Sequence, residues 1–154
     1  MPLKFVEITE DNYHELIDLE VKPDQKNCFY FKSTKPNMMS LAEAYVRKSG
    51  EVLAVYNGDT MIGCIYYQLY TLPDGKKEAW ITRLMLDQRY QGKGFGRKTM
   101  EMLIAWIKKE AGENLRIGLS YEPENVLAKS LYDSLRFVPN GEETAGQVVV
   151  WLNA

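Results

Sequence analysis

The chain has 154 residues, of which 45% are hydrophobic and 12% aromatic, so it is long enough to bury one sizeable core. We expect a single domain over residues 1–154. With 19 basic and 21 acidic residues the net charge is −2, which argues against nucleic acid or an anionic membrane as a partner. No apolar run approaches the ~20 residues that cross a bilayer, and Cys28 and Cys64 have neither metal-ligand nor redox-motif spacing. We therefore expect a soluble, cytoplasmic protein with reduced thiols and no metal.

The first half of the chain predicts one strand, two helices and an antiparallel meander. Residues 3–8 alternate as in a strand, and Thr9 with its acidic followers begins a helix. Ser40 and Glu43 form a capping-box pattern for a second, short helix, and Gly50 marks its expected C-terminus. Three strands follow, at residues 52–56, 61–70 and 79–86, with turns at 57–58 and 73–75.

The second half of the chain predicts two helices and two strands. Apolar residues between Gly96 and Ala111 fall on one helical face, and Gly112 is placed to cap that helix. Residues 125–135 predict another helix, with Leu127 on its apolar face. The remaining strands are expected at residues 115–120 and 147–152.

These elements predict an α/β fold with a mixed central sheet flanked by helices, in the order β-α-α-β-β-β-α-β-α-β. The helix that joins the strand ending at Leu86 to the strand starting at Leu115 predicts that these two strands are parallel neighbours. Ligands of such sheets bind beyond the carboxyl ends of the strands. The loop after Leu86 is therefore the first place to look for a site.

That loop combines glycines, cations and a helix start. Residues 87–98 read DQRYQGKGFGRK, with glycine at alternate positions 92, 94 and 96. Glycine lets the backbone approach an anion, and a helix N-terminus presents unpaired N–H groups. Four cations surround the helix start, where they are unfavourable unless an anion binds: Arg89, Lys93, Arg97 and Lys98. The segment predicts a diphosphate site, and the alternative is a glycine-rich turn with solvated cations.

Two other phosphate-binding motifs do not fit this loop. A Walker loop requires glycine at the position of Arg97, directly before Lys98 and Thr99. The dinucleotide fingerprint G-x-G-x-x-G, counted from Gly92, also requires glycine at position 97.

Gln91, Gly94 and Gly96 match the signature Q/R-x-x-G-x-G/A, and by it the chain resembles the GNAT superfamily of acyl-CoA-dependent N-acyltransferases. The predicted element order is similar to the GNAT fold over nearly the whole chain. Arg136 departs from a glycine of the family's downstream pattern N-x-x-A-x-x-L-Y-x-x-x-G-F, so we expect a different helix end there. Five residues match that pattern: Asn125, Ala128, Leu131, Tyr132 and Phe137.

The resemblance implies acetyl-CoA as the acetyl donor and divides its contacts among three segments. The backbone of Leu84, Met85 and Leu86 would pair with the pantetheine arm. Asn125 and Tyr132 would flank the thioester, with Tyr132 as the acid for the leaving thiolate. The structural alternatives are a helix N-cap for Asn125 and a half-buried aromatic side chain for Tyr132. The pyrophosphate would be held by Gln91, Gly92, Lys93, Gly94, Phe95, Gly96 and Arg97.

The acceptor amine needs to lose a proton. An amine resembling lysine has a pKa of ~10.4 and is mostly protonated at pH 7, so a proton acceptor should help. Asp87, Glu122 and Glu124 are candidates, acting directly or through water. Each is equally explained as a solvated loop carboxylate.

Within the superfamily, the chain is similar to the bacterial spermine and spermidine acetyltransferase group. The similarity rests on Val21, Gln25, residues 40–44 and the core sequence WITRLMLDQRYQGKGFG at residues 80–96. It implies a small amine acceptor of the polyamine type. Thr82 stands where that group tends to carry Asp or Glu, which weakens the implication. A candidate acceptor wall is formed by Phe29, Tyr30 and Phe31.

Two other functions and one mode of assembly stay open at this point. A GNAT-like domain could hold acyl-CoA without turnover, or it could acetylate a protein N-terminus or lysine side chain. The last strand, QVVVWL at residues 147–152, would favour a homodimer if it formed an exposed sheet edge.

Overall fold

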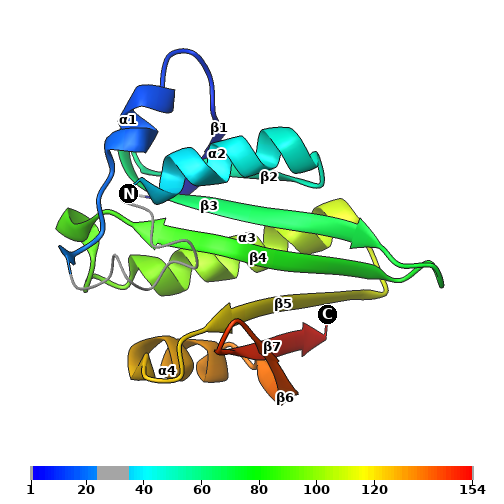
Figure 1. Cartoon of the computed structure of the whole chain (residues 1–154). Coiled ribbons are helices and arrows are strands. Elements are labelled where there is room, and N and C mark those ends of the chain that lie inside the picture. Colours follow the sequence, from blue (N-terminus) through cyan, green and yellow to red (C-terminus); the bar gives the residue numbers. More distant parts are fainter. Residues whose placement is uncertain (1, 24–34, 154) are drawn as a thin grey trace. The chain divides into compact units, whose positions relative to one another are not determined.

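The computed structural model describes residues 2–23 and 35–153 (Figure 1). Seven strands form one mixed sheet in the order β1-β2-β3-β4-β5-β7-β6, with four α-helices among the described residues. The predicted α/β fold class is confirmed. The chain divides into two compact units, Met1–Tyr67 with Arg83–Thr99 and Gln68–Thr82 with Met100–Ala154. Whether they act as one domain stays a prediction.

The first unit packs two helices on one side of its strands. β1 (Leu3–Glu7) pairs antiparallel with β2 (Gly50–Asn57). α1 (Tyr13–Asp18) and α2 (Pro36–Arg47) lie together beside β2 and β3 (Thr60–Thr71) in Figure 1. Removing apolar side chains from water here is the main favourable term in folding. The buried cluster contains Leu16, Leu19, Val21, Val52, Ala54, Met61, Cys64, Tyr66 and Met85.

A buried ion pair ties α2 to the end of β4 (Lys77–Leu86). Arg83 Nη2 donates to Glu43 Oε1 at 3.0 Å, and Arg83 Nη1 donates to Ser40 Oγ at 3.2 Å. The side chains of Arg83 and Glu43 are only 9% and 12% exposed. Removing either partner would leave a buried charge unpaired, so the two side chains specify how α2 sits on β4.

The capping box predicted for the second helix is wrong. α2 begins one turn earlier, with Pro36 in its first turn and Lys35 as the N-cap residue. Ser40 lies inside the helix, where its hydroxyl donates to the Pro36 carbonyl at 3.1 Å, and Glu43 pairs with Arg83 instead. Proline at the first helical position was the sequence signal for the true start.

Two other helix ends also differ from the prediction. α2 ends at Arg47, and Lys48 adopts the left-handed conformation with φ 55°, so Gly50 begins β2 instead of capping the helix. α1 begins at Tyr13 and not at Thr9, because Thr9 belongs to a turn in which its carbonyl accepts from the Tyr13 N–H at 3.1 Å.

The second unit contains the parallel pair that the sequence predicts. β5 (Leu115–Tyr121) is parallel to β4, with Lys77–Trp80 in register with Leu115–Gly118. β5 is antiparallel to β7 (Gln147–Asn153), and β6 (Val138–Thr144) forms a hairpin with β7 (Figure 1). The crossover through the long helix between β4 and β5 therefore makes these two strands parallel neighbours, as the sequence predicts.

Gly118 makes room for two tryptophans on one face of these strands. A Cβ atom at position 118 would lie 2.5 Å from Cζ3 of Trp151 and 2.8 Å from Cε3 of Trp80. The two indole rings meet edge to face with centroids 5.8 Å apart. Arg116 stacks over Trp151 at 3.8 Å and pairs with Glu78 at 2.7 Å. These contacts show that Trp80, Gly118 and Trp151 share one face of the sheet.

β6 lies where the sequence predicts no strand. Its sequence, VPNGEET, is exposed at every position and lacks the alternation that marks a half-buried strand. Because β6 lies outside β7, the segment at residues 147–152 is an interior strand. The predicted dimer edge at that segment is therefore wrong. A homodimer through another surface stays a prediction.

The two later helices follow their predicted patterns with one exception. α3 (Phe95–Ala111) buries Met100, Leu103 and Ile107 completely, and the Gly112 N–H donates to the carbonyl of Lys108. In α4 (Val126–Ser134), Leu127 is 83% exposed.

The half-buried stripe of α4 explains that exposure. It follows the spacing i, i+3, i+4, i+7, and Leu127 falls one residue outside it. The stripe consists of Ala128, Leu131, Tyr132 and Leu135.

No helix among the described residues has the length and apolarity needed to cross a membrane.

Candidate functional site

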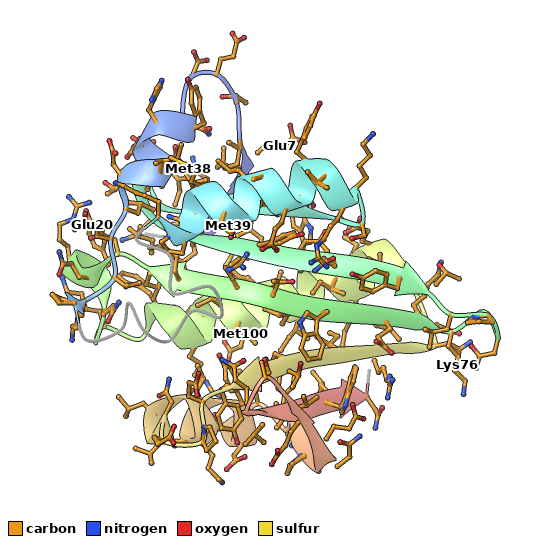
Figure 2. All side chains as sticks on the ribbon, in the orientation of Figure 1. Glu7, Glu20, Met38, Met39, Lys76 and Met100 are labelled. Atoms are coloured by element: carbon orange, nitrogen blue, oxygen red, sulfur yellow. The ribbon has the colours of Figure 1, made fainter. Side chains whose placement is uncertain are left out.

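Asp87 closes β4 and fixes the start of the glycine-rich loop. Its side chain is 4% exposed. Oδ1 accepts from the Arg89 Nε at 2.7 Å and from the Arg89 N–H at 3.0 Å, while Oδ2 accepts from the Glu20 N–H at 3.0 Å. Glu20, labelled in Figure 2, follows α1, and its carbonyl accepts from the Gln88 N–H at 2.7 Å. The carboxylate thus joins the segment after α1 to the loop that precedes α3.

These contacts argue against Asp87 as the catalytic base. Burial by itself raises the pKa of the Asp87 carboxyl. The hydrogen bonds from the Arg89 side chain and from the N–H groups of Glu20 and Arg89, together with the Arg89 charge, outweigh burial and lower the pKa below its usual value. A carboxylate with both oxygens engaged and a lowered pKa is a weak proton acceptor.

The loop after Asp87 is shaped by one amide side chain and two glycines. After a 3₁₀ turn at Gln88–Tyr90, Gln91 Nε2 donates to the Leu86 carbonyl at 2.9 Å. Gly92 and Gly94 have φ of 74° and 82°, a region that strains other residues. A Cβ atom at either position would meet no atom of the described residues within 4 Å. The loop leads into the α3 N-terminus, where backbone N–H groups lack helical partners.

The cations of the loop divide into two groups. Arg89 is bonded to Asp87, and both Arg89 and Lys93 lie over the Tyr90 ring, at 5.3 and 6.0 Å from its centroid. Arg97 and Lys98 are exposed in the first turn of α3. Of the four predicted cations, Arg89 already has its charge balanced by the Asp87 carboxylate.

Tyr132 lies in the second unit between two aromatic rings. Its ring centroid is 5.7 Å from that of Tyr121 and 6.0 Å from that of Phe137. Burial raises the pKa of the Tyr132 hydroxyl, so the group remains protonated and able to donate. The hydroxyl has no hydrogen-bond partner within residues 2–23 and 35–153.

The helix that carries Tyr132 is capped at both ends by residues of the resemblance pattern. Asn125 Oδ1 accepts from the Ala128 N–H at 3.1 Å, so Asn125 is the N-cap of α4. The sequence offered this role as the alternative to acetyl-CoA binding. Arg136 has φ 70°, the left-handed conformation that glycine favours just after a helix end, so Arg136 accepts backbone strain there. A helix end that differs from the family's stays a prediction.

The other two base candidates have different surroundings. Glu124 is exposed, whereas Glu122 is half-buried after the end of β5. Gln147 Nε2 donates to Glu122 Oε1 at 3.2 Å, and Ser120 Oγ donates to Gln147 Oε1 at 2.6 Å. The sequence gives no sign of Ser120 or Gln147, because only the pairing of β5 with β7 brings them together.

Thr82 belongs to a neutral hydrogen-bonded chain in the second unit. Gln68 Nε2 donates to Thr82 Oγ1 at 2.9 Å, and the Tyr70 hydroxyl donates to Gln68 Oε1. Gln25 and the aromatic residues at 29–31 lie outside the described residues, as does Cys28. Cys64 is buried, which raises the pKa of its thiol to about 12 and leaves it unreactive.

The predicted donor-binding residues fall into two groups, one in each compact unit. Leu84, Met85, Leu86 and residues 91–97 lie together in the first unit, around the end of β4 and the start of α3. Asn125 and Tyr132 lie together on the α4 segment of the second unit.

Comparison with known proteins identifies the class. Residues 13–137 match the acetyltransferase (GNAT) family, and the chain belongs to this family. It is an acetyl-CoA-dependent N-acetyltransferase. It is 33% identical over 145 residues to the spermine/spermidine N(1)-acetyltransferase of Bacillus subtilis (strain 168), covering 92% of this chain and 91% of that protein.

Solved structures share the fold at lower identity. The PaiA N-acetyltransferase from Thermoplasma acidophilum in complex with coenzyme A has a TM-score of 0.67 and 18% identity, covering 100% of each chain. The ribosomal-protein-S5-alanine acetyltransferase from Vibrio fischeri has a TM-score of 0.60 and 22% identity, covering 98% of this chain and 91% of that one. These likenesses confirm the predicted GNAT fold.

We predict that Asp87→Asn lowers the free energy of unfolding at pH 7 by about 1–3 kcal/mol, because a neutral amide cannot replace a buried carboxylate that accepts from three donors. A carboxyl with a lowered folded-state pKa stabilises the protein above its unfolded pKa of ~3.9, and that contribution disappears as pH falls through the folded-state pKa. The difference between the two proteins should therefore shrink at acid pH. Denaturant titrations from pH 7 to pH 3 measure it, and a constant difference would contradict the role of the charge.

Proposed function

We propose that this acetyltransferase transfers the acetyl group of acetyl-CoA to a small polycationic amine such as spermidine or spermine. The observation that carries the proposal is the 33% identity over 92% of the chain to a spermine/spermidine N(1)-acetyltransferase. Acetylation of a peptide or protein is the alternative that the experiments below separate from it.

In this proposal, the first unit binds the diphosphate end of the donor. The N–H groups of residues 91–97 and the α3 N-terminus face an anion, and Arg97 with Lys98 supplies positive charge. No described atom lies within 4 Å of a Cβ atom built at Gly92 or Gly94, which supports this assignment. Gln91 holds the loop against Leu86 and thereby fixes the distance between strand and helix start.

The same strand end binds the arm that carries the thioester. Backbone groups of Leu84, Met85 and Leu86 would pair with the amides of pantetheine, as the family resemblance implies. A backbone N–H of this segment would also stabilise the oxyanion that forms on the thioester carbonyl.

Transfer then requires two proton movements. The neutral amine attacks the thioester carbonyl carbon, the tetrahedral intermediate collapses, and the C–S bond breaks to release CoA as a thiolate. Tyr132 donates its proton to that sulfur, a role supported by its raised pKa. The ammonium formed on the acceptor loses its proton to water.

We predict that Gly94→Glu weakens acetyl-CoA binding about 10- to 100-fold, because it adds negative charge beside the diphosphate and strains a left-handed residue. Calorimetry at low and high salt measures it, and the wild-type affinity should fall with salt. Gly75→Glu is the matched control, since Gly75 has φ 85° and equally open surroundings in the turn before β4. Equal affinities for the two variants would contradict the site.

Tyr132→Phe is expected to lower kcat about 10- to 1,000-fold while leaving acetyl-CoA affinity nearly unchanged, because it removes the donor and keeps the ring. Tyr121→Phe removes a hydroxyl from the adjacent ring and should leave kcat within about threefold. Steady-state CoA release with a saturating amine measures both. Normal turnover by Tyr132→Phe would leave Tyr132 with a structural role only.

The acceptor is tested by kcat/KM for spermidine, a monoamine and a lysine peptide. We expect the wild type to prefer spermidine, and Thr82→Asp to increase that preference about tenfold, because a carboxylate at position 82 would add a charge-assisted contact to the polycation. The Gln68 amide, which now donates to Thr82, would still have an acceptor there. Preference of the wild type for the peptide would overturn the polyamine proposal.

A further inference from the structure

The face of the second unit that carries Trp80 ends in a carboxylate that forms no ion pair within residues 2–23 and 35–153. Trp80 packs over Gly118, so the face with Gly118 and Ser120 on β5 is also the face with Trp80 on β4. Beyond the end of β5 on this face stands Glu122, held by Gln147. β5 runs parallel to β4 and ends one residue before Glu122, and the carboxyl end of a parallel strand is a usual place for ligands.

Two carboxylates of the second unit lie at opposite ends of the β4–β5 pair and differ in charge balance. Glu78 accepts from Arg116 Nε at 3.0 Å and Nη2 at 2.7 Å, so its charge is neutralised within the protein. Glu122 accepts only the neutral amide of Gln147 and forms no ion pair with any residue that the structure describes. No residue in the described part of the chain donates to its Oε2 atom.

The hydrogen bonds around Glu122 run in one order, from Ser120 to Gln147 to Glu122, and they orient the carboxylate. An ionised carboxylate only accepts hydrogen bonds, so the Gln147 amide must turn its Nε2 toward Glu122 and its Oε1 toward Ser120. Ser120 must then donate, as its 2.6 Å contact to Gln147 Oε1 shows. Both partners come from strands, Ser120 from β5 and Gln147 from β7, so a rigid part of the fold holds the carboxylate.

We infer that Glu122 binds a protonated nitrogen of the acceptor that does not react, and that Gln147 and Ser120 are positioning residues for it. The reacting nitrogen must be neutral when it attacks the thioester. A carboxylate that binds a positive charge on the acceptor must therefore bind a second, protonated nitrogen of the same molecule. The substrate class is therefore a diamine or polyamine with a second ammonium group. This inference rests on the proposed function and names a residue for its acceptor specificity.

The test compares spermidine with butylamine, which has no second ammonium group, by CoA release at saturating acetyl-CoA. Glu122→Gln keeps the shape of the side chain and removes its charge. We expect it to raise KM for spermidine ~10- to 100-fold, with kcat within ~threefold and KM for butylamine unchanged. Glu113→Gln, at an exposed carboxylate in the turn before β5, is the matched control and should change neither KM.

Positioning is tested on the same assay. Gln147→Ala and Ser120→Ala should raise KM for spermidine ~2- to 10-fold without changing KM for butylamine, and Ser120→Thr, which keeps the hydroxyl, should retain the wild-type value. An unchanged KM for spermidine in Glu122→Gln overturns the inference. An equal fall in kcat for both amines also overturns it, because Glu122 would then accept the proton of the reacting amine. A wild type that acetylates neither amine would overturn the proposed function as well.

Discussion

A single buried carboxylate, Asp87, organises the glycine-rich loop that we propose as the donor site. It lies where β4 ends, and its two oxygens hold the residue after α1 and the first residues of the loop. A short loop rich in glycine has little reason to keep one shape by itself, because glycine loses more conformational freedom on folding than other residues. The hydrogen bonds of Asp87 and the bond from the Gln91 amide to the Leu86 carbonyl supply that constraint, and the anion site that we propose at the α3 N-terminus depends on both.

Charge is handled differently in the two compact units. In the first unit, Glu43 and Asp87 are each satisfied by an arginine, so these carboxylates stabilise the fold and are poor candidates for chemistry. In the second unit, Glu78 has its arginine partner but Glu122 has a neutral amide instead. A carboxylate that the protein orients without neutralising retains its attraction for a cation from outside. This contrast, together with the neutral Thr82, places acceptor recognition at the end of β5 in our proposal.

Local sequence determined most of the fold and the donor loop. Apolar patterns, turn residues and helix-end signals predicted ten of the strands and helices in order, because each of these signals depends on residues close together in the chain. The Q-x-x-G-x-G motif is also visible in the sequence, because its glycines and the neighbouring cations lie within a few residues of one another. The sequence did not predict β6, because all of its residues are exposed and no alternation of apolar and polar residues marks the strand.

Tertiary structure alone decided which polar residues are partners. Asp87 reads as a loop carboxylate until the fold brings the Glu20 N–H to it, from 67 residues away in sequence. Gln147 and Glu122 are 25 residues apart and meet only because β7 pairs with β5. Hydrogen bonds of this kind leave no periodicity in the chain, since a single polar residue at one strand position looks the same whether its partner is water or another side chain. The sequence therefore determined the family and its loop, while the packing of the chain determined that Asp87 pairs with Arg89 and that Glu122 accepts from the neutral amide of Gln147.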